Sequence, residues 1–75
     1  MTHMSHPFEK MFEKALKKSS SEDNFVLRDA IAIHAKGYSE TEIITVLTKL
    51  QKSLIDDMEA QIIAEALMDF EESLT

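Results

Sequence analysis

The strongest structural signal in this chain is HAKGYSETEI, residues 34–43. Gly37 is the only glycine in the 75 residues, and glycine adopts the left-handed backbone that ends a helix without a steric penalty. Ser39, followed three residues later by Glu42, forms a capping-box pattern that begins a new helix. The stretch therefore predicts a tight helix-turn-helix corner at Gly37-Tyr38-Ser39, with Tyr38 packing back on the helices that it joins.

Helical spacing of apolar residues continues on both sides of this corner. The preceding helix is expected over about residues 22–36, with an inward side made of Val26, Leu27, Ala30, Ile31, Ile33 and His34. The following helix is expected to end near Ser53 and to turn inward Ile43, Val46, Leu47, Leu50 and Leu54. Both segments are amphipathic, so each needs a neighbour to cover its apolar side.

Two further amphipathic segments lie at the ends of the chain. The first begins at Pro7, which suits a first helical turn, and its stripe is Phe8, Met11, Phe12, Ala15 and Leu16. It ends at Ser19, Ser20 and Ser21, any of which can cap the next helix, with Glu22 or Asp23 as the partner acid. The last begins at Asp57, behind a capping box of Asp56 and Glu59, and runs to Ser73 with inward Ile63, Ala66, Leu67, Phe70 and Leu74.

These segments predict an all-α fold, a small bundle of four amphipathic helices. Three helices are the alternative, because residues 52–57 contain neither Gly nor Pro and could bend without breaking. One glycine and one proline leave little turn chemistry for a sheet. A chain of this length can bury only one modest core, so residues 7–75 are expected to form a single helical domain. Residues 1–6 carry no folding pattern and are expected to be a disordered segment or a cloning remnant.

Several classes of protein are excluded by what the chain lacks. Without cysteine there are no disulfides, thiolate nucleophiles or thiolate metal sites. No phosphate-binding glycine loop or nucleophile-elbow serine is present, which predicts no enzyme and no cofactor. His3 and His6 lack a third ligand, so no metal is expected. No apolar run or signal sequence indicates a membrane, and we expect a cytoplasmic protein.

Charge is unevenly distributed along the chain. The formal net charge is −6, and residues 38–75 hold nine acids against two bases. In the last helix Glu65, Asp69 and Glu72 share the face opposite the inward residues, with no base between them. This strip is either a solvated outer face or a docking strip for a basic partner, or a mimic of a phosphate backbone.

Some apolar residues fall outside the inward stripes and indicate association. Phe25 either covers the first helix from the start of its own helix or is exposed for a partner. Ile44 and Ile55 also lie outside the apolar stripes of their helices. With Met58 and Met68 they predict a surface for self-association, with a homodimer as the expected oligomer, or for another protein. The candidate partner-binding residues are Glu65, Asp69, Glu72, Phe25, Ile44 and Met68. His34 is expected to be structural, donating to carbonyls at its helix end, or to be a pH-sensitive contact.

The run Ala35 to Ser39, followed by Glu42 and Ile43, resembles the first half of many bacterial helix-turn-helix domains, and the match covers Leu27 to Leu50. The resemblance implies a recognition helix after Leu50 that brings basic or amide side chains to base edges. The segment found there is acidic and departs from that pattern, so nucleic acid is an unlikely partner.

Three functions remain open from the sequence. The preferred one is a small, acidic, non-catalytic regulatory or adaptor module that binds a protein and self-associates through apolar helix faces. The alternative is a nucleic-acid-binding or transcription-related protein of helix-turn-helix descent, which requires one patch made of Lys10, Lys14, Lys17, Lys18 and Arg28. A third is a structural or enzymatic subunit whose site forms only between copies.

Overall fold

The chain folds into helices only, in a computed structural model that describes residues 7–20 and 22–74. Within those residues the helices are α1 (Pro7–Lys18), α2 (Phe25–Ala35), α3 (Glu40–Ser53) and α4 (Asp57–Ser73), and no strand occurs. The predicted all-α bundle is confirmed, with four helices and not three. The predictions for residues 1–6 and Ser21 lie outside the described residues.

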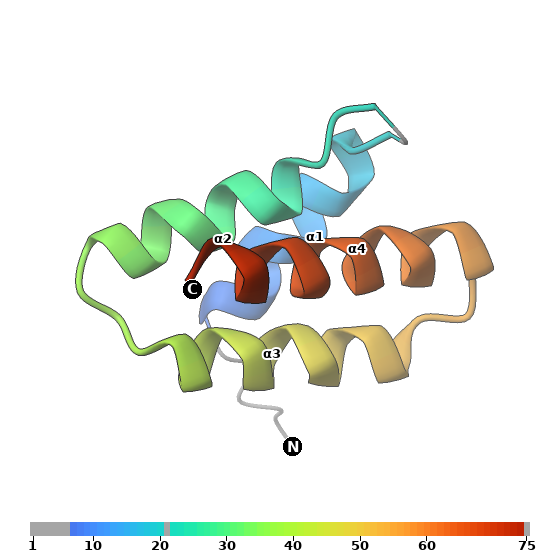
Figure 1. Cartoon of the computed structure of the whole chain (residues 1–75). Coiled ribbons are helices and arrows are strands. Elements are labelled where there is room, and N and C mark those ends of the chain that lie inside the picture. The colour runs from blue at the N-terminus through green and yellow to red at the C-terminus, as the bar shows by residue number, and fades with distance from the viewer. Residues whose placement is uncertain (1–6, 21, 75) are drawn as a thin grey trace, which may run out of the picture.

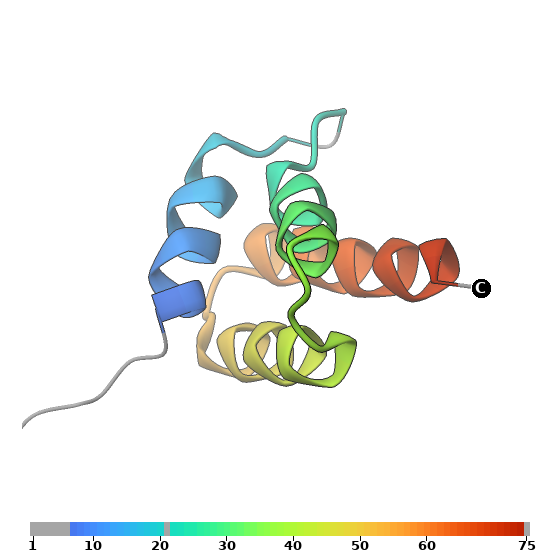
Figure 2. The same ribbon diagram turned by 90° about the vertical axis from the view of Figure 1, so that its left-hand side faces the viewer.

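The four helices form a bundle in which α1 and α4 occupy opposite corners. Each of these two helices packs mainly against α2 and α3, and they touch one another only slightly. Figure 1 shows α4 in front of α1, with α2 above and α3 below, and the turned view in Figure 2 places α1 and α4 on opposite sides. In Figure 2 the C-terminal part of α4 is the part of that helix farthest from α1.

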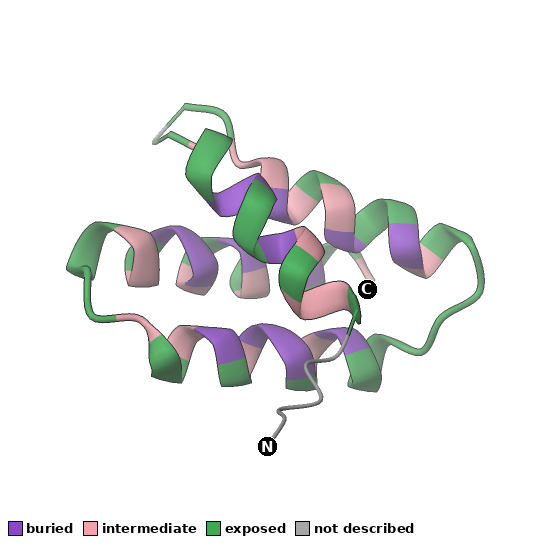
Figure 3. Ribbon diagram, turned by 180° about the vertical axis from the view of Figure 1, so that it is seen from behind, coloured by how far each residue is buried: buried purple, intermediate pink, exposed green. Residues whose placement is uncertain are grey.

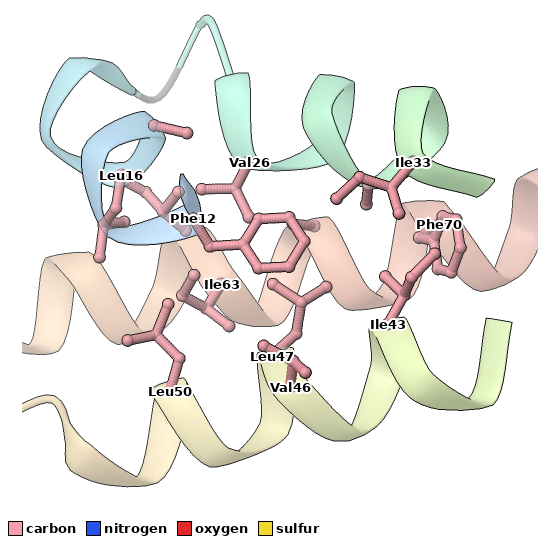
Figure 4. Close-up of a cluster of buried hydrophobic side chains, with 14 residues drawn as sticks. Phe12, Leu16, Val26, Ile33, Ile43, Val46, Leu47, Leu50, Ile63 and Phe70 are labelled. Atoms are coloured by element: carbon pink, nitrogen blue, oxygen red, sulfur yellow. The ribbon is translucent and has the colours of Figure 1, made fainter. Parts of the chain in front are cut away.

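A single cluster of fourteen apolar side chains holds the helices together. All four helices contribute to it, with Phe12 from α1, Val26 from α2, Leu47 from α3 and Phe70 from α4 fully or almost fully buried (Figure 4). Buried residues follow the inward side of each helix while the outward sides are exposed (Figure 3). No polar or charged residue in the described part of the chain is buried, so apolar packing supplies the core.

The glycine stop and the serine cap at the corner between α2 and α3 have the predicted geometry. Gly37 has a φ of 110°, and the Lys36 and Gly37 amides donate to carbonyls in the last turn of α2. Ser39 Oγ accepts from the Glu42 amide at 3.2 Å, which caps α3 as expected. Tyr38 packs edge-on against Phe8 of α1, with ring centroids 4.9 Å apart, so the corner is also fixed to the first helix.

The start of α2 differs from the prediction. The helix begins at Phe25, and its N-cap is Asn24, whose side-chain oxygen accepts from the Leu27 amide at 3.0 Å. Ser19 still serves as expected, because its hydroxyl accepts from the Phe25 amide at 2.9 Å. The Ser20 hydroxyl accepts instead from the Glu22 and Asp23 amides, which closes a turn before the helix.

The break between α3 and α4 lies at Leu54–Asp56 and needs neither Gly nor Pro. Leu54 has an extended backbone, and one Asp56 carboxylate oxygen accepts from the Met58 amide at 2.8 Å and the Glu59 amide at 3.3 Å. The side chain of Gln51 donates to the carbonyl of Ala60 at 3.4 Å and ties the two helices across the break. The predicted bounds of both helices are confirmed.

One inward assignment, Ile31, was wrong, and one buried residue, Ile62, was not predicted. Ile31 is 44% exposed, because the buried stripe of α2 follows Val26, Ala30 and Ile33 and leaves Ile31 at its edge. Ile62 is buried at 9% exposure although its neighbour Ile63 occupies the centre of the stripe. The reason is that α4 packs on both α2 and α3, so its buried arc is wider than one contact requires.

Candidate functional site

The outward surface of α4 combines exposed apolar and acidic side chains along its length. We call it the α4 face; it consists of Met58, Gln61, Glu65, Met68, Asp69 and Glu72, which recur every three or four residues. All six are exposed, and the two methionines at 72% and 58% are among the most exposed large apolar residues described. The helix carries six acids and no base. The α4 face therefore presents exposed apolar side chains with acidic side chains beside them.

A shallow hollow of about 340 Å³ opens at the first half of this face. Its walls are Met58 and Ile62, which are apolar, with the polar side chains of Asp57, Gln61 and Glu65 around them. The Gln61 amide donates to the Glu65 carboxylate at 3.2 Å, which orients both side chains. Ile55, 97% exposed, lies just before the helix and extends the apolar surface toward the α3–α4 corner.

The charges of the α4 face do not stabilise their own helix. Glu65 and Asp69 are four residues apart, and like charges at that spacing destabilise a helix by about 0.2–0.5 kcal/mol. Glu71 and Glu72 lie in the last turns, where the negative end of the helix dipole disfavours acids, and no base is found there. Negative charge therefore accumulates at the C-terminal half of α4 at the expense of helix stability.

The structure groups only part of the predicted partner-binding set. Glu65, Met68, Asp69 and Glu72 lie together on the α4 face. The remaining two candidates, Phe25 of α2 and Ile44 of α3, are half-buried and pack against the core. Met58, which the sequence placed with the apolar surface, belongs to the α4 face.

A second surface feature brings Phe25 together with three of the five residues of the basic patch considered from the sequence, Lys14, Lys18 and Arg28. A hollow of about 290 Å³ between α1 and α2, here called the α1–α2 groove, is lined by Met11, Lys14, Ala15, Lys18, Phe25 and Asp29. The guanidinium carbon of Arg28 lies 5.4 Å from the centre of the Phe25 ring, within cation–π range. The groove therefore has an apolar floor with basic residues at its rim. Helical wheels drawn one helix at a time could not place the α1 lysines beside Phe25.

Asp29 is the acid in this groove, and its environment perturbs it. Partial burial raises the pKa of the Asp29 carboxyl, while the charges of Lys18 and Arg28 lower it by a smaller amount. Because the folded chain holds this proton more tightly than the unfolded chain, the stability contributed by Asp29 is greatest at acid pH. It declines as the pH rises through the raised pKa.

Replacing Asp29 with asparagine should therefore stabilise the fold slightly at neutral pH, by less than about 0.5 kcal/mol because water screens this partly exposed charge. The amide keeps the size of the side chain and removes the partly desolvated charge. The difference should shrink as the pH falls through the raised pKa of the wild-type Asp29 carboxyl, which is then protonated. Urea unfolding of both proteins across this range checks the prediction, and a variant that is less stable at pH 7 would contradict it.

His34 contacts an aromatic ring of the neighbouring helix. It is half-buried, and its ring lies edge-on to Phe70 of α4 with centroids 5.8 Å apart. The carbonyls at the end of α2, which this ring was expected to contact, accept instead from the backbone amides of Lys36 and Gly37. The contact supports the structural interpretation of this residue.

Two findings concern the described part of the chain and one concerns the whole sequence. No group of three or more histidines or acids there is arranged to hold a metal ion, and His3 and His6 lie outside that part of the chain. No helix within it is long and apolar enough to span a membrane. Comparison of the chain with known protein families, curated proteins and solved structures found no match.

Proposed function

We propose that this chain is a small, non-catalytic regulatory or adaptor module whose α4 face binds a basic, amphipathic segment of a partner protein. The observation that supports this most directly is the placement of exposed Met58 and Met68 among Glu65, Asp69 and Glu72 on one helix face. Acids alone would make a solvated surface, and methionines alone a weak apolar one. Together they fit a partner that carries both Lys or Arg and apolar side chains.

The side chains of the α4 face suit the docking of a helix. Met58 and Met68 are ten residues apart, about 15 Å along α4, so they can contact side chains two to three turns apart on a partner helix. Methionine is flexible and adapts to differently shaped apolar partners. The acids of the α4 face attract the basic residues of the partner and orient its approach, and this contribution weakens as salt screens the charges.

Two further expectations concern the compartment in which the protein acts and nucleic acid as an alternative partner. A chain without cysteine suits the reducing cytoplasm, where we expect the module to act. Nucleic acid is the weaker alternative, because α4 stands where the helix-turn-helix resemblance expects a recognition helix, and it carries no base. The specific observation in favour of nucleic acid is that Lys14, Lys18 and Arg28 gather at the α1–α2 groove.

Binding of a designed peptide tests the proposal. The probe is a fluorescent helical peptide with leucines on one face and lysines on the other, titrated with the protein at about 50 and 150 mM NaCl. We expect the double variant Glu65→Lys with Asp69→Lys to bind at least about tenfold more weakly than wild type, since two attractive charges become repulsive. A peptide with glutamates in place of the lysines should not bind measurably.

A matched variant separates specific docking from general attraction to an acidic protein. Glu22→Lys with Asp23→Lys changes the net charge by the same amount at exposed residues of the α1–α2 loop. The proposal expects this variant to keep nearly wild-type affinity. Equal losses in both double variants would mean that the peptide senses only net charge, and the α4 face would then have no special role.

A further inference from the structure

The α1–α2 groove is the counterpart of the α4 face in both charge and polarity. Its floor contains Met11, Ala15 and Phe25, and its rim carries Lys14 and Lys18. Arg28, stacked on Phe25, adds a third positive charge beside the same floor. Lys14 and Lys18 are four residues apart on one helix, the same spacing as Glu65 and Asp69 on the α4 face.

The two surfaces cannot meet within one chain. α1 and α4 lie at opposite corners of the bundle, with α2 and α3 between them, as the views in Figures 1 and 2 agree. The acidic α4 face and the basic rim of the groove therefore belong to two helices that touch each other only slightly. Complementary surfaces placed in this way can pair only between separate molecules.

We propose that the α4 face of one copy docks in the α1–α2 groove of a second copy, so that the chains associate head to tail. This inference rests on the proposed function, since it uses the α4 face as the docking surface and names its basic partner as this chain itself. Met58 or Met68 would lie on the floor formed by Met11 and Phe25. The acids of the α4 face would then lie near the basic rim of the groove.

The arrangement also determines the kind of oligomer. A closed dimer forms only if each copy presents its face and its groove to the same neighbour. Otherwise a head-to-tail contact leaves a free face at one end and a free groove at the other, so further copies add to form a ring or an open chain. We expect the head-to-tail contact to continue from copy to copy, so that the assembly grows with concentration beyond the homodimer expected from the sequence.

Asp29 tunes this contact because it contributes a negative charge to a groove that receives acids. Lys18 and Arg28 both act on its carboxyl and offset part of that charge. Asp29→Asn is therefore expected to strengthen the association by about two- to fivefold, by removing a repulsive charge without changing the shape of the groove. No other acid lines this groove.

Sedimentation equilibrium of the full chain tests the inference. At about 25 mM NaCl the weight-average mass should rise with protein concentration beyond that of two copies, and about 500 mM NaCl should weaken association at least about tenfold. Lys14→Glu with Lys18→Glu should abolish the association, and so should Glu65→Lys with Asp69→Lys. The matched variant Lys49→Glu with Lys52→Glu, at exposed residues of α3, should associate like wild type.

Mixing the two inactive variants gives the sharpest result. One has a basic face and a basic groove, the other an acidic face and an acidic groove, so an equal mixture should recover association that neither shows alone. A wild type that remains monomeric at several hundred micromolar in low salt, or a mixture that fails to recover association, would overturn the inference. If the lysine peptide still binds the α4 face in that case, the proposed function stands and only the self-partner is wrong.

Binding of duplex DNA at the groove is the remaining outcome to distinguish. If wild type bound DNA with a strong salt dependence, and Lys14→Glu with Lys18→Glu abolished that binding while sedimentation showed no association, the groove would be a site for phosphates. That result would also overturn the self-association.

Discussion

Replacing Phe12 with alanine is expected to lower the free energy of unfolding by about 3–5 kcal/mol. Phe12 is fully buried at the centre of the core, where the side chains of α2, α3 and α4 converge (Figure 4). A domain of this size has a total stability of about 4–11 kcal/mol, so the expected loss is a large fraction of it. The loss is the sum of two free energies: the hydrophobic transfer free energy of the ring that is removed, and the cost of the cavity that remains.

The Phe8→Ala variant is the matched control for Phe12→Ala. Phe8 lies one turn earlier on the same helix, is half-buried and packs edge-on against Tyr38. It should lose about 1–2 kcal/mol, because part of its ring already contacts water. Urea unfolding followed by circular dichroism measures both variants. Equal losses at the two positions would contradict the placement of Phe12 at the centre of the core.

Asn24→Ala is expected to lower the free energy of unfolding by about 1.5–3 kcal/mol. The Asn24 side chain makes two contacts at once: its oxygen caps α2, and its nitrogen donates to the carbonyl of Ile62 in α4 at 3.0 Å. Alanine removes both, and it leaves a helix amide and a half-covered carbonyl without these partners. Few single surface substitutions should have as large an effect.

Asn24→Asp separates the two contributions. Aspartate keeps the capping oxygen and suits the positive end of the helix dipole, but it has no amide to donate to Ile62. The loss should therefore be smaller than for alanine and reflect mainly the link between α2 and α4. An aspartate variant as stable as wild type would mean that this link contributes nothing, and thermal unfolding of the three proteins decides it.

Much of the fold could be predicted because local signals and apolar spacing agreed. The corner at Gly37, the cap at Ser39 and the start of α4 behind Asp56 each follow from one or two side chains acting on nearby backbone groups. The start of α2 was misplaced because three serines and Asn24 compete for the same role. Asn24 prevails where its amide also reaches Ile62, a contact 38 residues away that no local pattern contains.

The candidate site could be predicted only where it lies on one helix. The α4 face follows from the spacing of Glu65, Asp69 and Glu72, and α4 keeps that spacing. The α1–α2 groove depends on how two helices pack, and it brings Lys14 and Lys18 beside Phe25. Ile44 was assigned to a surface because it lies off its stripe, yet it packs on the core since α3 is covered from two sides by α1 and α4.

We propose that the partner binds to the α4 face and not to every exposed apolar residue. Ile55 is more exposed than either methionine, but it lies outside the acidic strip in the α3–α4 corner. A partner that recognises both charge and apolar contact should therefore depend on Met68 more than on Ile55. A larger loss of affinity on changing Met68 than on changing Ile55 would distinguish docking at the α4 face from nonspecific binding to exposed apolar residues.

The most direct test is an amide chemical-shift titration of the isotope-labelled full chain with the leucine–lysine peptide. We expect the largest chemical-shift changes in residues 58–72 of α4. These changes should disappear in the Glu65→Lys with Asp69→Lys variant and remain in the Glu22→Lys with Asp23→Lys variant. Shifts centred on α1 or α3, or spread evenly over all acidic residues, would contradict the assignment of the α4 face as the docking surface.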